Sequence, residues 1–328
     1  MRIPPAWFDG FFILRPTLFF PAWTAFLAGF RLRDANAPSP IPLLIWLAGA
    51  TGAAFLLNQL VDRHEDTLNR KLLPLWDGLL SSRFIKAELG ILGAGTILGG
   101  VWAGGELSAL LTLFFIIAGY LYNVPPFRLK SRPFLGIAAC SVGGSILFAM
   151  GARTGSSEFG AAFLLSLPYI FAGAAASLLT HVPDIEGDRQ SGATTFASKY
   201  GLRATAMAAL VMVAATLISA LWLRDFVMLF AALVALPLFI RFYLNLNVEA
   251  AQTAVKSAIF SLAVAVGTTW IPLLAMIALY YPLARWYHRE RLGLDYPSFK
   301  STAKHPIAPA MASSNPGGRF AVGDHLSR

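Results

Sequence analysis

Charged residues are scarce in this chain of 328 residues. They make up 13% of it, while hydrophobic residues make up 56%. Soluble domains usually carry about 25% charged residues. Uncharged stretches such as 133–152, 159–183 and 204–223 reach the ~17–25 residues that a helix needs to cross the hydrocarbon core. This composition excludes an ordinary soluble domain and predicts a polytopic membrane protein.

Cysteine is rarer still, because Cys140 is the only one in the sequence. No internal disulfide can form, and the apolar stretch around Cys140 predicts that it is a small core residue. A signal peptide with a small-residue cleavage site is also missing. The first apolar segment is interrupted by Arg15 and Pro16, which predicts a helix that is retained in the membrane.

Long apolar stretches, by contrast, recur along most of the chain. They predict an all-α polytopic membrane helix bundle of about nine transmembrane helices. The expected spans are 11–30, 41–57, 89–105, 107–127, 133–152, 159–183, 204–223, 226–240 and 257–284. We expect residues 1–282 to form one transmembrane domain. Residues 283–328 are expected to form an interfacial segment with an aromatic belt, followed by a disordered polar tail.

The net charge of +9 is explained by membrane topology and does not indicate a nucleic-acid partner. With nine spans, fifteen basic residues fall on the side of the N-terminus and four on the other side, and the positive-inside rule makes the first side cytoplasmic. We therefore expect a bacterial plasma-membrane protein. The seven basic residues after Ala284 fall outside in this count, which conflicts with the rule.

Two acidic clusters interrupt the apolar pattern, and the nine-span count places both on the cytoplasmic side. They hold six of the 17 acidic residues. Carboxylates at a membrane boundary are costly unless they are paired or hold a cation. Asn58, Asp62 and Asp66 are spaced i, i+4, i+8, and Asp184 and Asp188 are again four apart. Mg²⁺ prefers such oxygen ligands together with phosphate groups, so these five residues are candidate metal ligands for a phosphorylated substrate.

Three segments in this order resemble the UbiA superfamily of intramembrane prenyltransferases. The first cluster resembles its N-x-x-x-D-x-x-x-D motif. Residues 184–195 are similar to its D-x-E-G-D-R-x-x-G-x-x-T motif, and residues 122–130 are similar to its Y-S-x-P-P-x-R-x-K segment. A looser similarity links residues 15–21 and 62–64 to the chlorophyll-synthase and archaeal ether-lipid branches. The resemblance extends over nearly the whole chain up to about residue 282.

The resemblance implies that two Mg²⁺ ions bind a prenyl diphosphate donor, with Asp62, Asp66, Asp184 and Asp188 as catalytic residues. A lipophilic acceptor would attack the allylic cation; it would be an aromatic or quinone precursor, a chlorophyllide-like molecule or a glycerol-ether lipid. Diphosphate binding by Arg128 and Lys130, and cation stabilisation by Tyr122, are expected on the same basis. The full set of expected substrate-binding residues is Asn58, Tyr122, Arg128, Lys130, His181, Arg189 and Lys199.

Other interpretations stay open for several of these residues. Arg128 and Lys130 also fit simple positive-inside anchoring, and His181 fits a hydrogen-bonded structural role as well as a general base. Gln59 follows Asn58 where many family members have aspartate, so one frequent carboxylate is missing. The main rival function is a cation-coupled transporter that uses the acidic clusters as ion sites, although it favours acids near the bilayer midplane.

Overall fold

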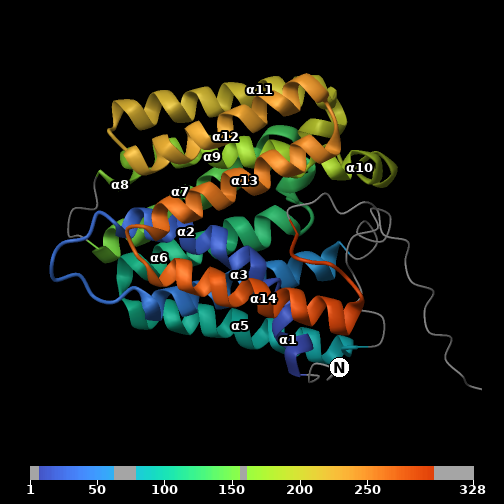
Figure 1. The fold of residues 1–328 in the computed structure, drawn as a ribbon. Helices are drawn as coiled ribbons and strands as arrows, with labels where there is room; N and C mark the ends of the chain where they lie inside the picture. The colour runs from blue at the N-terminus through green and yellow to red at the C-terminus, as the bar shows by residue number, and fades with distance from the viewer. Residues whose placement is uncertain (1–6, 63–78, 156–160, 299–328) are drawn as a thin grey trace, which may run out of the picture.

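The long helices of the protein lie side by side and alternate in direction, as Figure 1 shows for the computed structural model. The structure describes residues 7–62, 79–155 and 161–298, and over these residues it contains helices and no strand. Seven helical segments are long and apolar enough to cross a membrane, and the segment Gly105–Leu121 adds a shorter apolar one. The all-α, multi-pass membrane class expected from the sequence is confirmed.

Most of the described elements are long helices, and short ones join several of them. In chain order the helices are α1 (Trp7–Ile13), α2 (Phe19–Phe30), α3 (Ile41–Val61), α5 (Ser82–Ala103), α6 (Gly105–Phe114), α7 (Pro133–Gly155), α8 (Ala162–Leu165), α9 (Leu167–Thr180), α10 (Ile185–Ser191), α11 (Phe196–Trp222), α12 (Phe226–Asn245), α13 (Val248–Gly267) and α14 (Pro272–Leu292). Four shorter turns are η1 (Pro16–Leu18), the π-helical η2 (Phe115–Leu121), η3 (Leu129–Ser131) and η4 (Val182–Asp184).

Small residues let α2 and α7 approach each other closely. A Cβ added to Gly29 would collide with the carbonyl oxygen of Phe148, and one added to Gly151 would collide with that of Phe26. In a bilayer, helix association depends on such close packing because lipid is as apolar as the helix surface. The outer surface is accordingly rich in exposed large hydrophobic residues, such as Trp102.

The span expected over residues 257–284 is in fact divided between two helices. α13 ends at Gly267, and Pro272 begins α14 after a short turn. Proline fixes a backbone angle that suits the first turn of a helix, where its missing N–H is not needed. One expected span is therefore two helices, and the second of them, α14, continues across residue 282 to Leu292.

This extra helix returns the chain to the end of the bundle where α1 lies (Figure 1). Asp9 of α1 is completely buried and accepts hydrogen bonds from the Tyr287 hydroxyl (2.7 Å) and the Arg291 guanidinium (2.6 Å) of α14. Tyr287 stacks on Phe12 with its ring centre 3.9 Å away. Tyr287 is thus a buried packing residue between α14 and α1.

Candidate active site

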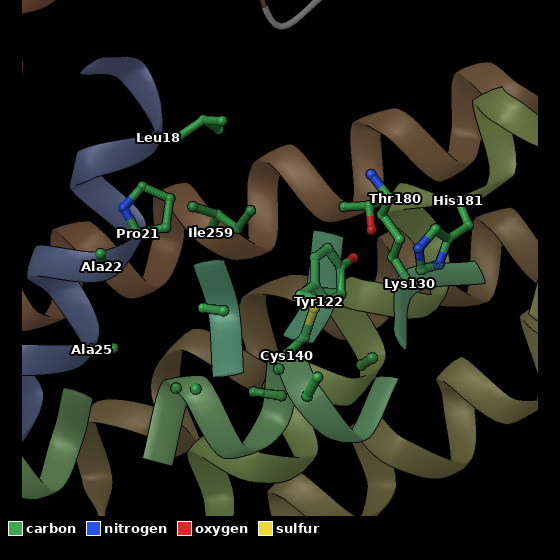
Figure 2. Close-up of a pocket in the computed structure, with 18 of the residues that line it drawn as sticks. Leu18, Pro21, Ala22, Ala25, Tyr122, Lys130, Cys140, Thr180, His181 and Ile259 are labelled. Carbon is green, nitrogen blue, oxygen red and sulfur yellow. The ribbon is translucent and has the colours of Figure 1, made fainter. Parts of the chain in front are cut away.

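A cavity of about 660 Å³ lies inside the bundle, and residues of both acidic motifs line the same cavity. The first motif contributes Asn58 and Asp62, and the second contributes Asp184 and Asp188. Figure 2 shows Lys130, Thr180 and His181 grouped on one side, away from the α2 residues in this view. Segments 122 positions apart in the sequence therefore share one polar pocket. Asp66, the remaining expected metal ligand, lies outside the described residues.

The first motif is positioned by the end of α3. Asp62 caps this helix, and its backbone N–H donates to the carbonyl oxygen of Asn58. The Asn58 side-chain amide donates to Asp62 Oδ2 (2.6 Å) and to Asn123 Oδ1 (2.7 Å). Asn123 is held in turn, because its own amide donates to the Gly119 carbonyl oxygen of η2 at 2.8 Å. Asn58 and Asp62 are thereby fixed side by side at the edge of the cavity.

Two cations neutralise Asp62. Lys130 Nζ pairs with Asp62 Oδ2, and Arg128 Nη2 lies 3.2 Å from Asp62 Oδ1. Arg128 has a left-handed backbone with φ of 38°, which is uncommon for a residue with a side chain. This bend sends the chain into η3 and brings Arg128 and Lys130 to the same carboxylate. A carboxylate that is 9% exposed is stable there because its charge is compensated.

The second motif is built at the junction after α9. His181 follows this helix, Asp184 ends the turn η4, and Asp188 lies in the first turn of α10. The Thr195 hydroxyl donates to Asp188 Oδ2 at 2.8 Å and accepts from the Ser198 backbone N–H, so it also caps α11. Asp188 is therefore tied to the start of the next transmembrane helix.

Asn123 and Thr195 support the motifs although the sequence assigned them no role. Both residues lie inside the recognised segments. Asn123 stands where the family pattern has serine, and a buried amide with two donors can bridge more partners than a hydroxyl. The replacement of serine by asparagine at this position is the feature of the sequence from which a role of Asn123 could have been predicted. Thr195 is the last threonine of the second motif, followed directly by an apolar helix, which is the position of a helix cap.

Tyr122 and Cys140 lie together on the cavity wall. Tyr122 follows η2, Cys140 comes from α7, and Figure 2 shows the sulfur beside the tyrosine ring. Both residues line the cavity. Cys140 was expected to be a core residue because its neighbours in sequence are apolar. It is instead exposed, and the surface that it faces is this cavity.

Three of the expected substrate-binding cations, Arg128, Arg189 and Lys199, do not line the cavity, although Arg128 contacts Asp62, which does. Arg189 and Lys199 are exposed, and the Lys199 ammonium lies 5.4 Å from the centre of the neighbouring Tyr200 ring. In sequence, Arg189 belongs to the second motif, and Lys199 follows it on α11. Their side chains leave α10 and α11 on the outer faces of those helices.

The contacts of Gln59 explain why glutamine, and not the aspartate of many family members, follows Asn58 in the first motif. Its side chain is 4% exposed, and its amide donates to the Ile13 carbonyl oxygen at 2.7 Å and to that of Phe55 at 3.3 Å. An ionised carboxylate only accepts hydrogen bonds, so aspartate could not make the contact with Ile13. Gln59 thus anchors the end of α1, and two residues later Arg15 reaches the rim of the cavity.

The oxygen donors at this end of the cavity suit Mg²⁺ in kind. Carboxylates of Asp62, Asp184 and Asp188 and the amide oxygen of Asn58 are the hard ligands that Mg²⁺ takes up. Among the described residues, however, no three His, Cys, Asp or Glu side chains meet at one point. In this arrangement Lys130 and Arg128 supply the positive charge next to Asp62.

The rest of the cavity is an apolar arm between α2, α7, α9 and α12. Its walls consist largely of small residues, which leave room for a ligand. They include Ala22, Ala25, Gly143, Gly144, Ala172, Gly173, Ala176, Ala231, Ala232 and Ala235. A polar end joined to an apolar arm suits an amphiphilic ligand with an anionic head and a long hydrocarbon tail.

The fold and the site together define an intramembrane helix bundle with a cavity for an amphiphile. The chain matches the model of the UbiA prenyltransferase family over residues 18–263, and it belongs to this family. The resemblance expected from the three motifs is confirmed.

Several known proteins are similar to this chain. The homogentisate phytyltransferase of Synechocystis sp. is 29% identical over 181 residues, which cover 51% of this chain and 58% of that protein. The digeranylgeranylglyceryl phosphate synthase of Methanoregula boonei is 31% identical over 180 residues, 52% of this chain and 62% of that protein. A chlorophyll synthase of Avena sativa is 27% identical and is covered to 42%. The chain thus spans about half the length of these relatives.

The solved structures agree on the fold. A UbiA homolog from Archaeoglobus fulgidus, bound to GPP and Mg²⁺, superimposes with a TM-score of 0.61 over 81% of this chain and 99% of that chain. Its sequence is 21% identical. A structure described as digeranylgeranylglyceryl phosphate synthase in membranes gives a TM-score of 0.60 at 13% identity. The likeness shows that the helix arrangement is shared.

Proposed function

We propose that this protein transfers an isoprenyl chain from a prenyl diphosphate to a lipophilic acceptor and releases diphosphate, with Mg²⁺ as its cofactor. One observation carries this proposal: a single cavity joins both acidic motifs to a long apolar arm. The anionic head of the donor would occupy the polar end and its hydrocarbon tail the arm. The relatives named above and the archaeal homolog bound to GPP and Mg²⁺ support the same assignment.

Asn58, Asp62, Asp184 and Asp188, together with Asp66, would hold two Mg²⁺ ions, which supply the positive charge that lets a diphosphate leave. Lys130 and Arg128 can turn from Asp62 to the diphosphate oxygens, where charged hydrogen bonds are strong. Asn123 keeps Asn58 and Lys130 in place. The π face of Tyr122 is available to the allylic cation formed when the C–O bond breaks.

The acceptor completes the reaction by bonding to that allylic carbon and losing a proton. His181 lines the same end of the cavity and can take up the proton there. The relatives include a homogentisate phytyltransferase, a chlorophyll synthase and a digeranylgeranylglyceryl phosphate synthase. We therefore propose all three acceptor classes: aromatic or quinone precursors, chlorophyllide-like molecules and glycerol-ether lipids.

We place the polar end of the cavity at the cytoplasmic face of a bacterial plasma membrane. The direction of α14 supports this orientation, because Arg291 at its end pairs with Asp9 near the N-terminus. The basic residues in the last turns of α14 therefore lie on the side that carries the basic excess. A cation-coupled transporter would instead need carboxylates near the bilayer midplane. Asp62 and Asp184 lie where helices end, and no observation favours the transporter.

A mass-spectrometric acceptor screen tests the proposal. The purified protein would receive Mg²⁺, geranyl, farnesyl or geranylgeranyl diphosphate, and one acceptor from each class: homogentisate, chlorophyllide or geranylgeranylglyceryl phosphate. A product heavier than the acceptor by one prenyl group supports the proposal. The control is the same mixture with Asp62→Asn, which lacks a carboxylate at the polar end of the cavity and should give no product. Absence of prenylated product with every combination would contradict the proposal.

A further inference from the structure

A tyrosine lies at the end of the cavity away from the second acidic motif. Tyr169 lies near the start of α9, is 4% exposed and lines the cavity. Leu147 of α7 and Met228 of α12 line the cavity with it. The ring of Phe148 packs behind Tyr169, with the two ring centres 4.7 Å apart. These residues form a floor of large side chains below walls that are mainly alanine and glycine.

An ion pair fixes the floor from below. Arg31, directly after α2, pairs with Asp225, and its Nε donates to the Ala28 carbonyl oxygen at 2.9 Å. Asp225 also accepts a hydrogen bond from the Met228 backbone N–H at 3.0 Å, so it caps the helix that carries part of the floor. The pair thus ties α2 to α12 at this end of the bundle.

The Tyr169 hydroxyl faces this pair. It is buried without a hydrogen bond of normal geometry, and it interacts electrostatically with both Arg31 and Asp225. Moving the ring away would carry a polar group from a charged pair into an apolar cavity, which is unfavourable. Tyr169 therefore forms a fixed wall rather than one that yields to a longer ligand.

The depth of the apolar arm follows from α9. Twelve residues separate Tyr169 from His181 at the polar end, which corresponds to roughly 18 Å at the helical rise of 1.5 Å per residue. A hydrocarbon chain with bonds of about 1.5 Å meeting at about 111° advances about 1.25 Å per bond when extended. About fourteen bonds therefore fit. A three-unit isoprenoid has twelve chain carbons, and a four-unit one has sixteen, which reaches the floor with slight bending.

We propose that Tyr169, held by the Arg31–Asp225 pair, limits the prenyl donor to four isoprene units. This inference rests on the proposed function, and it names the donor class that the same cavity accepts: linear diphosphates of three or four units. A five-unit chain extended along α9 would meet the tyrosine ring.

Binding of donor analogues tests this limit without knowledge of the acceptor. The probes are non-hydrolysable prenyl thiolodiphosphates of two, three, four and five units, titrated with Mg²⁺ into the purified protein and into Tyr169→Ala, Tyr169→Trp and Tyr169→Phe. Affinity for the wild type should rise up to four units and fall at five. Tyr169→Ala should bind the five-unit analogue at least tenfold more tightly than the wild type does, a change of ~1.4 kcal/mol.

Tyr169→Trp supplies the opposite change. It should weaken the four-unit analogue by about tenfold, again ~1.4 kcal/mol, and leave the two-unit analogue unaffected. Tyr169→Phe keeps the ring but loses the hydroxyl that faces the Arg31–Asp225 pair, so it should bind the five-unit analogue more tightly than the wild type and less tightly than Tyr169→Ala does. If Tyr169→Ala does not fold, the affinities of Tyr169→Trp and Tyr169→Phe for the four-unit and five-unit analogues still test whether residue 169 limits the chain length.

Two failures can be told apart. A wild type that binds the analogues in order of length, with the same profile in Tyr169→Ala and Tyr169→Trp, overturns the floor and leaves the proposed function intact. A wild type that binds no prenyl analogue more tightly than diphosphate itself overturns the proposed function, and the floor with it.

Discussion

Replacing Gln59 by glutamate would keep the shape of the side chain and remove its hydrogen-bond donors. The wild-type amide is buried and donates to the Ile13 carbonyl oxygen at 2.7 Å. An ionised glutamate would face that oxygen with another acceptor. The side chain can regain a donor by protonation, and moving a carboxyl of pKa ~4.3 to the protonated form at pH 7 costs up to ~4 kcal/mol at 1.36 kcal/mol per unit.

The sign of the pH dependence follows from linkage. A carboxyl whose pKa is higher in the folded protein than in the unfolded one costs stability above the unfolded pKa, and this cost disappears as the pH falls below it. Gln59→Glu should therefore be less stable than the wild type by up to ~4 kcal/mol at pH 7 and approach it near pH 4–5. Gln59→Leu removes the donors without adding a titrating group, so it should lose about 1–3 kcal/mol at every pH.

The assay is thermal unfolding in detergent of the wild type and both variants across pH 4.5 to 8, followed by tryptophan fluorescence. The quantity that matters is the difference from the wild type at each pH, because the wild type has a pH dependence of its own. A Gln59→Glu variant as stable as the wild type at pH 8 would show that Gln59 does not hold α1 through a donated hydrogen bond.

Three further predictions follow from the packing and the site. Gly151→Ala should be destabilised by at least 1–3 kcal/mol because its Cβ would collide with α2, whereas Gly93→Ala, with open space around it, should be neutral or stabilised in detergent unfolding. Arg128→Lys and Lys130→Ala should each weaken donor binding about ten- to a hundredfold, since charged hydrogen bonds contribute ~1.5–3 kcal/mol. If the donor KM and kcat are unchanged in both variants, the two residues serve only as positive charges that fix the membrane topology. Maleimide should modify Cys140 in the free protein, and a bound Mg²⁺–prenyl analogue should slow this reaction; equal rates with and without the analogue would place the ligand elsewhere.

The motifs were predictable from the sequence because their geometry is local. Asn58 and Asp62 are one helical turn apart on α3, and Asp184 and Asp188 are four positions apart around the start of α10, so both pairs follow from spacing alone. The apolar stretches predicted the class of fold for the same reason. Length and composition decide whether a helix can cross a bilayer, independently of its neighbours.

The contacts between motifs could not be predicted because they depend on tertiary structure. Lys130 reaches Asp62 across 68 positions of sequence through the left-handed backbone at Arg128. Likewise, the role of Gln59 becomes visible only when α1 lies against α3. The turn between α13 and α14 did leave a signal, since Gly267 and Pro272 bracket it. Residues 268–271 carry no charge, so the uncharged stretch in the sequence continues through the turn.

The central claim is that both acidic motifs act on one prenyl diphosphate. It is tested most directly by measuring prenyl transfer and diphosphate release together, with an acceptor found in the screen. The wild type would be compared in Mg²⁺ and in chelator, alongside Asp62→Asn and Asp188→Asn, whose side chains come from opposite motifs. The account predicts that both activities fall by orders of magnitude in chelator and in each folded variant. Full transfer in chelator, or in either variant, would contradict it.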